Sequence, residues 1–236
     1  MAGPQCCSNP PNLNPSSGEG TVDQLGGLKA YISGTPHPKL AILLVTDGFG
    51  YKAPNLRKLA DKVAAAGFYV VAPDFFYGEP FDWNRPLQDW LKDHETDKGF
   101  EDAKLVVEAL RSKGFSAVGA AGFCWGGKVA IELAKCNLIQ AAVLCHPSFV
   151  TLDDVKGVKV PISILAAEID QLTPPAIAKR SEEVLTAKSE VDSYVEVFPK
   201  VVHGWTLRYE VDDEAAANAA EDAHKKMLDW FSKYVK

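Results

Sequence analysis

Short runs of uninterrupted apolar residues alternate along the chain with segments in which apolar residues recur every three or four positions. Residues 40–46 (LAILLVT) form one apolar run and residues 69–72 another, and residues 55–66 between them carry the helical spacing. An uninterrupted apolar run is typical of a strand that is covered on both faces of a sheet. The pattern therefore predicts a β-α-β unit in this part of the chain.

The same alternation continues along the rest of the chain. It predicts an amphipathic helix over residues 99–113 and a closing helix over residues 214–234. Strands that alternate with helices are typical of a mostly parallel central sheet with helices on both faces. We therefore expect the α/β class with a sheet wound on both sides. The remaining strands are predicted at residues 117–121, 141–145, 160–167 and 193–198, and a further helix at residues 128–134.

Two segments lack a clear period. Residues 1–20 are rich in Pro, Asn, Ser and Gly, and they predict a flexible leader over residues 1–27. Residues 28–236 then form one domain, because their length suits a single α/β unit with its own core. Residues 75–98 are aromatic and charged, and we expect them to form a long loop with short helical pieces over the sheet edge.

The composition is typical of a globular protein, with 47% apolar residues, 24% charged residues and a net charge of −6. This balance argues against nucleic acid or an anionic membrane as the main partner, since either favours a basic patch. The first residues show no signal-peptide pattern and no apolar stretch that could span a bilayer, which predicts a cytoplasmic location. The five cysteines stand at no metal-ligand spacing, so we expect no metal, and Cys6 and Cys7 are assigned to the leader. We also expect no cofactor and a monomer or weak homodimer.

Residues 122–126 (GFCWG) join a predicted strand to a predicted helix, as in a nucleophile elbow. Such a turn holds its central residue in strained backbone geometry, and flanking glycines let the neighbouring backbone approach. The turn exposes the Cys124 sulfur at a helix N-terminus, where unpaired N–H groups favour a thiolate and an oxyanion. The alternative is a buried structural cysteine beside a glycine-rich turn.

An acid and a base follow later strands in the order that a hydrolase of this architecture requires. Asp170 follows the strand predicted at residues 160–167, and His203 follows the strand predicted at residues 193–198. We interpret Cys124 as the nucleophile, His203 as the base and Asp170 as the group that fixes the imidazole tautomer. A turn or N-cap residue at position 170 and a core histidine at position 203 are the alternatives.

The loop after the first long strand is predicted to complete an oxyanion hole. One donor is the Trp125 N–H, and the other comes from the backbone around Gly48 or Phe49. Asp47 in the same loop is predicted to control the thiol, either by keeping its proton in place or by accepting it. A solvated turn aspartate is the alternative. His146, at another strand end, is expected to border the pocket and is not assigned as the base.

Several motifs together resemble the dienelactone hydrolase family, which includes the carboxymethylenebutenolidases. The resemblance covers about residues 28–234. Within the family, the chain looks similar to the plant members. The resemblance implies an α/β-hydrolase fold, a Cys-Asp-His triad, no metal, and hydrolysis of lactone or ester bonds in small molecules. It also implies that an acidic residue in the first loop controls the thiol, which corresponds to Asp47. The motifs are residues 122–127 (GFCWGG), 47–50 (DGFG), 73–76 (PDFF), 168–170 (EID) and 203–205 (HGW).

Family members that act on dienelactone hold a substrate carboxylate with arginines. The resemblance therefore makes Arg208 the first candidate for substrate binding and Arg85 a weaker second, with surface exposure as the alternative for each. Phe49 and Trp205 are predicted to line an apolar site, although aromatic residues near a sheet are often part of the core.

Two other functions remain open. Some plant members of the family carry a mixed-linkage β-glucanase label, but glycoside hydrolysis usually needs two carboxyl groups that flank the bond. Asp47, Glu168 and Asp170 supply such a pair only if the triad is abandoned. A non-catalytic small-molecule receptor on the same fold is the second alternative, because fold alone does not decide function.

Overall fold

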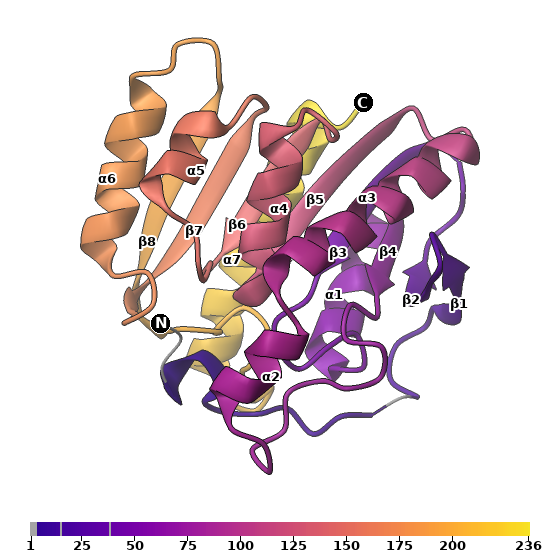
Figure 1. Ribbon diagram of the computed structural model, residues 1–236, viewed down its shortest axis with the longest axis horizontal. Coiled ribbons are helices and arrows are strands. Elements are labelled where there is room, and N and C mark those ends of the chain that lie inside the picture. The colour runs from indigo at the N-terminus through magenta and orange to yellow at the C-terminus, as the bar shows by residue number, and fades with distance from the viewer. Residues whose placement is uncertain (1–3, 15, 38) are drawn as a thin grey trace.

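A long mixed sheet runs through the molecule (Figure 1). The computed structural model describes residues 4–14, 16–37 and 39–236. Over these residues the sheet has eight strands in the order β1-β2-β4-β3-β5-β6-β7-β8; β1 and β2 are antiparallel to their neighbours, and all other pairs are parallel. The strands are β1 (Thr21–Leu25), β2 (Leu28–Ser33), β3 (Leu40–Val45), β4 (Tyr69–Pro73), β5 (Ala117–Phe123), β6 (Ala141–Cys145), β7 (Ile162–Ile169) and β8 (Ser193–Val202).

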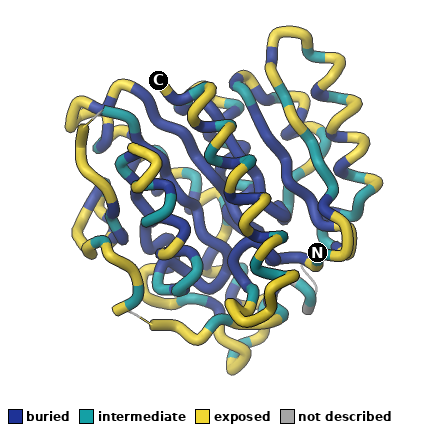
Figure 2. The backbone as a smooth tube through the Cα atoms, turned by 180° about the vertical axis from the view of Figure 1, so that it is seen from behind, coloured by how far each residue is buried: buried dark blue, intermediate teal, exposed yellow. Residues whose placement is uncertain are grey.

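Helices cover both faces of this mostly parallel sheet, as the alternating pattern predicts, and the α/β class is confirmed. One face packs against α3 to α6 and the other against α1 and α7. Figure 2 shows the result, with the central strands buried and the helices exposed on their outer sides. No helix among the described residues is long and apolar enough to cross a membrane. The helices are α1 (Pro54–Ala65), α2 (Leu87–Asp93), α3 (Thr96–Ser112), α4 (Trp125–Lys135), α5 (Leu152–Gly157), α6 (Pro175–Thr186) and α7 (Glu214–Tyr234).

The largest difference from the predicted elements is at the start of the chain. The pattern predicts no strand before residue 40, yet β1 and β2 form a hairpin that extends the sheet. The first four residues of β1 are exposed on this sheet edge, so they carry no apolar signal. Gly26 and Gly27 make the turn with φ of 61° and 86°, which glycine adopts at little steric cost.

The predicted leader of residues 1–27 also contains a short 3₁₀-helix, Pro4–Cys7. The Cys7 side chain is 1% exposed and belongs to the same apolar cluster as α3 and α4. We call residues 4–14 the N-terminal segment, and in Figure 1 this segment and α2 lie together at the lower edge of the view. Residues 1–3 and the side chain of Cys6 lie outside the described part of the chain.

An irregularity interrupts the pairing of β7 with β8. Ala167 pairs with Phe198 and Ile169 pairs with Val202, so β8 contains extra residues between these two pairs. Lys200 within this stretch has a φ of 61°, and its N–H donates to Glu168 Oε2 at 2.6 Å. A bulge of this kind bends a strand and redirects the side chains that follow it.

Candidate active site

Cys124 occupies a sharp turn between β5 and α4. Its φ of 51° and ψ of −112° place a non-glycine residue in backbone geometry that L residues rarely adopt. The flanking glycines are required here: a Cβ on Gly122 would lie 2.2 Å from the Gly126 carbonyl oxygen, and one on Gly126 would lie 2.1 Å from that of Val45. The strand, turn and helix of the predicted elbow are therefore present.

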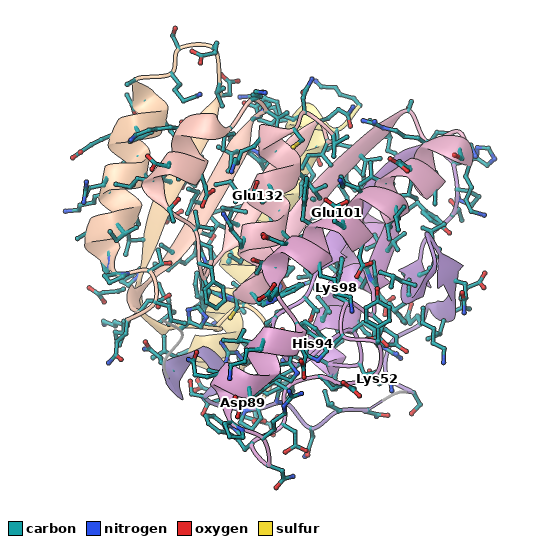
Figure 3. All side chains as sticks on the ribbon, in the orientation of Figure 1. Lys52, Asp89, His94, Lys98, Glu101 and Glu132 are labelled. Carbon is teal, nitrogen blue, oxygen red and sulfur yellow. The ribbon has the colours of Figure 1, made fainter. Side chains whose placement is uncertain are left out.

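Charged groups on the outer face of α4 hold this helix against α5. Glu132, which Figure 3 labels on α4, lies 2.7 Å from Lys128 and 2.9 Å from Lys135. Both lysines also reach Asp154, at 2.8 and 2.9 Å. Burial raises the pKa of Asp154, but its hydrogen bonds with Lys128, the Thr151 backbone and Lys135 outweigh burial and lower the pKa overall. The network stabilises the helix that begins directly after the thiol.

His203 and Asp170 form a buried pair at the ends of β8 and β7. His203 Nδ1 lies 2.7 Å from Asp170 Oδ2, and Asp170 Oδ1 accepts from the backbone N–H groups of Leu172 and Thr173 at 2.8 and 3.1 Å. Burial lowers the pKa of His203, but the negative charge of Cys124 and hydrogen bonds with Asp170 and Cys124 outweigh it and raise the pKa to about 9. The geometry fits a thiolate and an imidazolium stabilised by a carboxylate.

The three residues predicted to act together thus lie together, and all are buried. Cys124 is 0% exposed, His203 1% and Asp170 6%. Cys124 Sγ also lies 3.4 Å from Ser148 Oγ. Trp125 is the first residue of α4, so no partner within the helix accepts from its backbone N–H. Its indole Nε1 donates at 2.9 Å to the carbonyl of His94, which Figure 3 labels where α2 meets α3.

The loop after β3 lies beside these groups and carries a buried ion pair. Asp47 Oδ2 is 3.4 Å from Arg208 Nε, and both side chains are 2% exposed. The Phe49 N–H donates to Asp47 Oδ1 at 3.1 Å. Burial raises the pKa of Asp47 and outweighs the opposing effects of Arg208, the Phe49 N–H and His203. Asp47 is therefore a buried, paired carboxylate and not a solvated turn residue.

The N-terminal segment covers the ends of these strands. Gln5 bridges the backbone on both sides of Asp170, since its side chain donates to the Ile169 carbonyl at 2.9 Å and accepts from the Gln171 N–H at 2.7 Å. Arg208 Nη1 donates to the Ser8 carbonyl at 2.8 Å. These contacts help to explain why the thiol and the imidazole have almost no exposed surface.

The loop after β4, residues 75–98, also covers this site. Cys7 Sγ lies 3.9 Å from the position that a Cβ on Gly48 would take, and the Phe81 N–H donates to the Gly48 carbonyl at 2.7 Å. A cavity of about 410 Å³ lies where the two covering segments meet. Its lining residues are Pro10, Pro11, Leu13, Phe49, Gly78, Glu79, Pro80, Phe81, Asp82 and Trp83.

Of the predicted substrate-binding residues, three lie at the buried site and one lies on the surface. Phe49 lies under Arg208, whose guanidinium is 5.6 Å from the centre of the ring, and Trp205 packs at 5.2 Å on His146. Arg85 is the one on the surface. It forms an ion pair with Asp93 and donates to the Asp89 carbonyl, both on α2, because the loop runs along the surface there.

Several groups near the thiol have no motif of their own in the sequence. His146, which the sequence places only at a pocket border, is 0% exposed, and its ring centre is 5.1 Å from that of His203. Burial lowers the pKa of His146 well below its ordinary value, and the charge of His203 adds to this effect. Ser148 was missed, and its only signal is its position two residues beyond His146 at a strand end. The described residues contain no group of three or more His, Cys, Asp or Glu side chains that could hold a metal ion.

The chain is similar to several known proteins. The model of the dienelactone hydrolase family matches residues 28–235. A carboxymethylenebutenolidase homologue of Xenopus tropicalis is 32% identical over 226 residues, which are 92% of each chain. A maize endo-1,3;1,4-β-D-glucanase is 44% identical over 193 residues, and the match spans 79% of this chain but 63% of the maize protein.

Solved structures show the same fold. A Klebsiella pneumoniae protein assigned as a dienelactone hydrolase superposes with a TM-score of 0.75 at 21% identity, over 92% of this chain and 98% of that chain. At this identity the likeness supports the fold alone.

Proposed function

The chain belongs to the dienelactone hydrolase family and is a lactone or ester hydrolase, and we propose that it acts on a small molecule through Cys124, His203 and Asp170. The observation that carries this proposal is the buried chain of contacts from Asp170 through His203 to Cys124. The 2.7 Å contact fixes the imidazole, and the charge of the sulfur raises the pKa of His203. This arrangement is the one that nucleophilic acyl transfer requires.

In the first half of the reaction the Cys124 thiolate attacks the acyl carbon, and an oxyanion forms on the carbonyl oxygen. The Trp125 N–H is one donor to it. Gly48 supplies the second, since the Phe49 N–H is already donated to Asp47. The tetrahedral intermediate collapses to a thioester as the carbon–oxygen bond of the ester breaks. The His203 imidazolium gives its proton to the leaving alkoxide, which in a lactone stays attached to the acyl group.

In the second half a water molecule attacks the thioester. Neutral His203 takes a proton from the water, and the carbon–sulfur bond breaks to release a carboxylic acid and regenerate the thiolate. Asp170 holds the imidazole tautomer with Nε2 toward the reaction in both halves.

Asp47 and Arg208 are proposed to regulate the thiol and to sense substrate charge. The charge of His203 acts on the Asp47 carboxyl group, and Arg208 Nε lies 3.4 Å from Asp47 Oδ2. A substrate carboxylate would compete with Asp47 and with the Ser8 carbonyl for Arg208. Arg208→Ala should therefore reduce kcat/KM for a carboxylate-bearing lactone more than for its neutral ester analogue. Equal losses for both substrates would remove Arg208 from the substrate site.

The decisive experiment replaces the nucleophile. Cys124→Ala should lower hydrolysis of an activated aryl ester and of a lactone panel by several orders of magnitude, while circular dichroism stays unchanged. Cys136→Ala is the matched control, because Cys136 is a free and exposed cysteine. Rapid quenching should trap an acyl group on the Cys124 peptide. A Cys124→Ala variant that keeps most of its turnover would refute the triad.

The same variant tests the alternative that the maize relative suggests. Mixed-linkage glucan cleavage by a glycosidase needs two available carboxyl groups. Here Asp170 is bonded to His203, and Asp47 is paired with Arg208. Glucan cleavage that persists in Cys124→Ala would establish a separate glycosidase site, and ligand binding with no turnover in the parent would establish a receptor.

A further inference from the structure

The loop after β6, residues 146–149, contains two non-glycine residues in the left-handed region. His146 has a φ of 39° and Phe149 a φ of 64°. Such backbone geometry costs free energy and persists where surrounding contacts hold it, often at functional sites. The His146 N–H donates to the Leu165 carbonyl at 2.8 Å, which anchors the start of the loop on β7.

This loop contacts each of the three turns that carry the proposed triad. At the base, His146 Nε2 lies 2.7 Å from Thr206 Oγ1, three residues beyond His203. At the acid, the Thr173 hydroxyl donates to the Pro147 carbonyl at 2.6 Å. The Thr173 N–H in turn donates to Asp170 Oδ1, so the loop acts on the acid through one residue.

At the nucleophile the contact is with the sulfur itself. Ser148 Oγ is 3.4 Å from Cys124 Sγ, and the Ser148 N–H donates to the Cys124 carbonyl at 2.9 Å. Ser148 is 1% exposed, so the hydroxyl has no access to bulk water. Most buried hydroxyls have a hydrogen-bond partner, and the Cys124 sulfur, as a thiolate, is a charged acceptor within reach of this one.

We infer that the Ser148 hydroxyl donates a hydrogen bond to the Cys124 thiolate, holds its sulfur in position for attack and favours the ionised form. The inference rests on the proposed role of Cys124 as the nucleophile. The backbone bond between the same two residues fixes the distance across the contact, because it ties the serine to the turn that carries the thiol. No motif of the elbow, acid or base contains Ser148.

Other charged or titratable groups also lie at this site, and their effects must be separated from that of the hydroxyl. His203 interacts with the sulfur directly. Asp47, Arg208 and His146 each interact with His203 or with one another. Replacing Ser148 by Ala removes one oxygen and leaves every one of these groups in the chain. A change in the ionisation of the Cys124 thiol in this variant therefore measures the effect of the Ser148 hydroxyl.

The test is a pH titration of thiolate absorbance in the full-length protein. The Cys124 signal is the difference between each variant and the same variant with Cys124→Ala. In Ser148→Ala the titration midpoint should rise by about one pH unit, and kcat/KM for an aryl ester should fall about tenfold at neutral pH. Ser148→Thr retains the hydroxyl and should keep the parental midpoint.

Ser163→Ala is the matched control. Ser163 is also 1% exposed, lies in β7, and its hydroxyl has no hydrogen-bond partner among the described residues. Its midpoint and kcat/KM should equal those of the parent. An unchanged midpoint in Ser148→Ala, or an equal shift in Ser148→Thr and Ser148→Ala, would overturn the inference. An active parent protein with no thiolate signal from Cys124 would instead refute the proposed nucleophile.

Discussion

The two sides of the active site are built in different ways. On the sheet side, Cys124, Asp170 and His203 stand on turns that begin directly at the ends of β5, β7 and β8. Short hydrogen bonds join the acid turn to the base and to the loop after β6. On the covering side, the N-terminal segment and the loop of residues 75–98 lie over these turns. The sheet side holds the residues of the proposed triad, and the covering side shields them from solvent.

Within the covering side, the N-terminal segment is held by few contacts. Gln5 and Ser8 contribute three hydrogen bonds between them across this boundary, and Cys7 contributes apolar packing. Segments with few buried contacts open at a lower free energy than strands at the centre of a sheet. The comparison therefore predicts that the N-terminal segment opens while Cys124, His203 and Asp170 stay assembled.

The largest expected effect is on the sheet side. Asp170→Asn should lower kcat about 10²- to 10⁴-fold, because the amide no longer stabilises the imidazolium and permits the wrong tautomer. Asp153→Asn is the control, since Asp153 forms an exposed ion pair with Lys156. Steady-state kinetics on an aryl ester measure both. A pH–rate profile and a kcat equal to those of the parent would remove Asp170 from the site.

The second effect concerns stability and pH. The pKa of His203 is raised in the folded protein to about 9, from an ordinary value of 6.5. The raised pKa means that protonation of His203 stabilises the folded protein. This stabilisation is complete below pH 6.5, is lost as the pH rises through about 9, and amounts to at most about 3 kcal/mol.

Urea unfolding at neutral pH and at about pH 9.5 measures this loss. In Cys124→Ala the loss should shrink, because the charge that raises the pKa of His203 most strongly is gone. The same pH dependence in both proteins would contradict the thiolate–imidazolium pair.

The third prediction concerns the thiol. Asp47→Asn should raise the rate at which iodoacetamide alkylates Cys124 by about tenfold at neutral pH, because it removes a buried negative charge near the thiolate. Turnover should fall if Asp47 also accepts the proton. Mass spectrometry of the Cys124 peptide follows the reaction, and Asp82→Asn in the covering loop is the control. An unchanged alkylation rate would leave Asp47 as a partner of Arg208 only.

The smallest effect isolates the covering side. Gln5→Ala removes both hydrogen bonds that hold the N-terminal segment beside Asp170, so alkylation of Cys7 and Cys124 should rise together by roughly threefold. Two other cysteines serve as internal standards: exposed Cys136 should react at the parental rate, and buried Cys145 should stay protected. Faster alkylation of Cys145 as well would show general unfolding and contradict separate opening.

The same division explains what could be predicted from the sequence. The central strands carry apolar runs, and the elbow carries glycines that its tight turn requires, so both leave a local signal. The positions of Asp170 and His203 follow from the rule that reactive groups gather at the carboxyl ends of parallel strands. The sheet side was therefore accessible to reasoning from pattern and spacing.

The covering side left no such signal. Gln5, Cys7 and Ser8 reach the site through contacts across more than 40 positions of the chain, and their polar, irregular segment has no period. Arg85 is the opposite case, in which a residue gave a signal but does not reach the site. Its charge suggested an anion site, but partners on α2 hold it on the surface.

The irregular pairing between β7 and β8 limits how the chain can vary in length. The extra residues of β8 between Phe198 and Val202 determine where His203 meets Asp170. Side chains alternate between the two faces of a strand, so a deletion of one residue in this stretch turns the following side chains to the opposite face. Insertions and deletions should be tolerated in the exposed turn before β8, at residues 188–190, and not within this part of the strand. Libraries that explore new substrates can vary the length of the chain in that turn while they keep β8 at its present length.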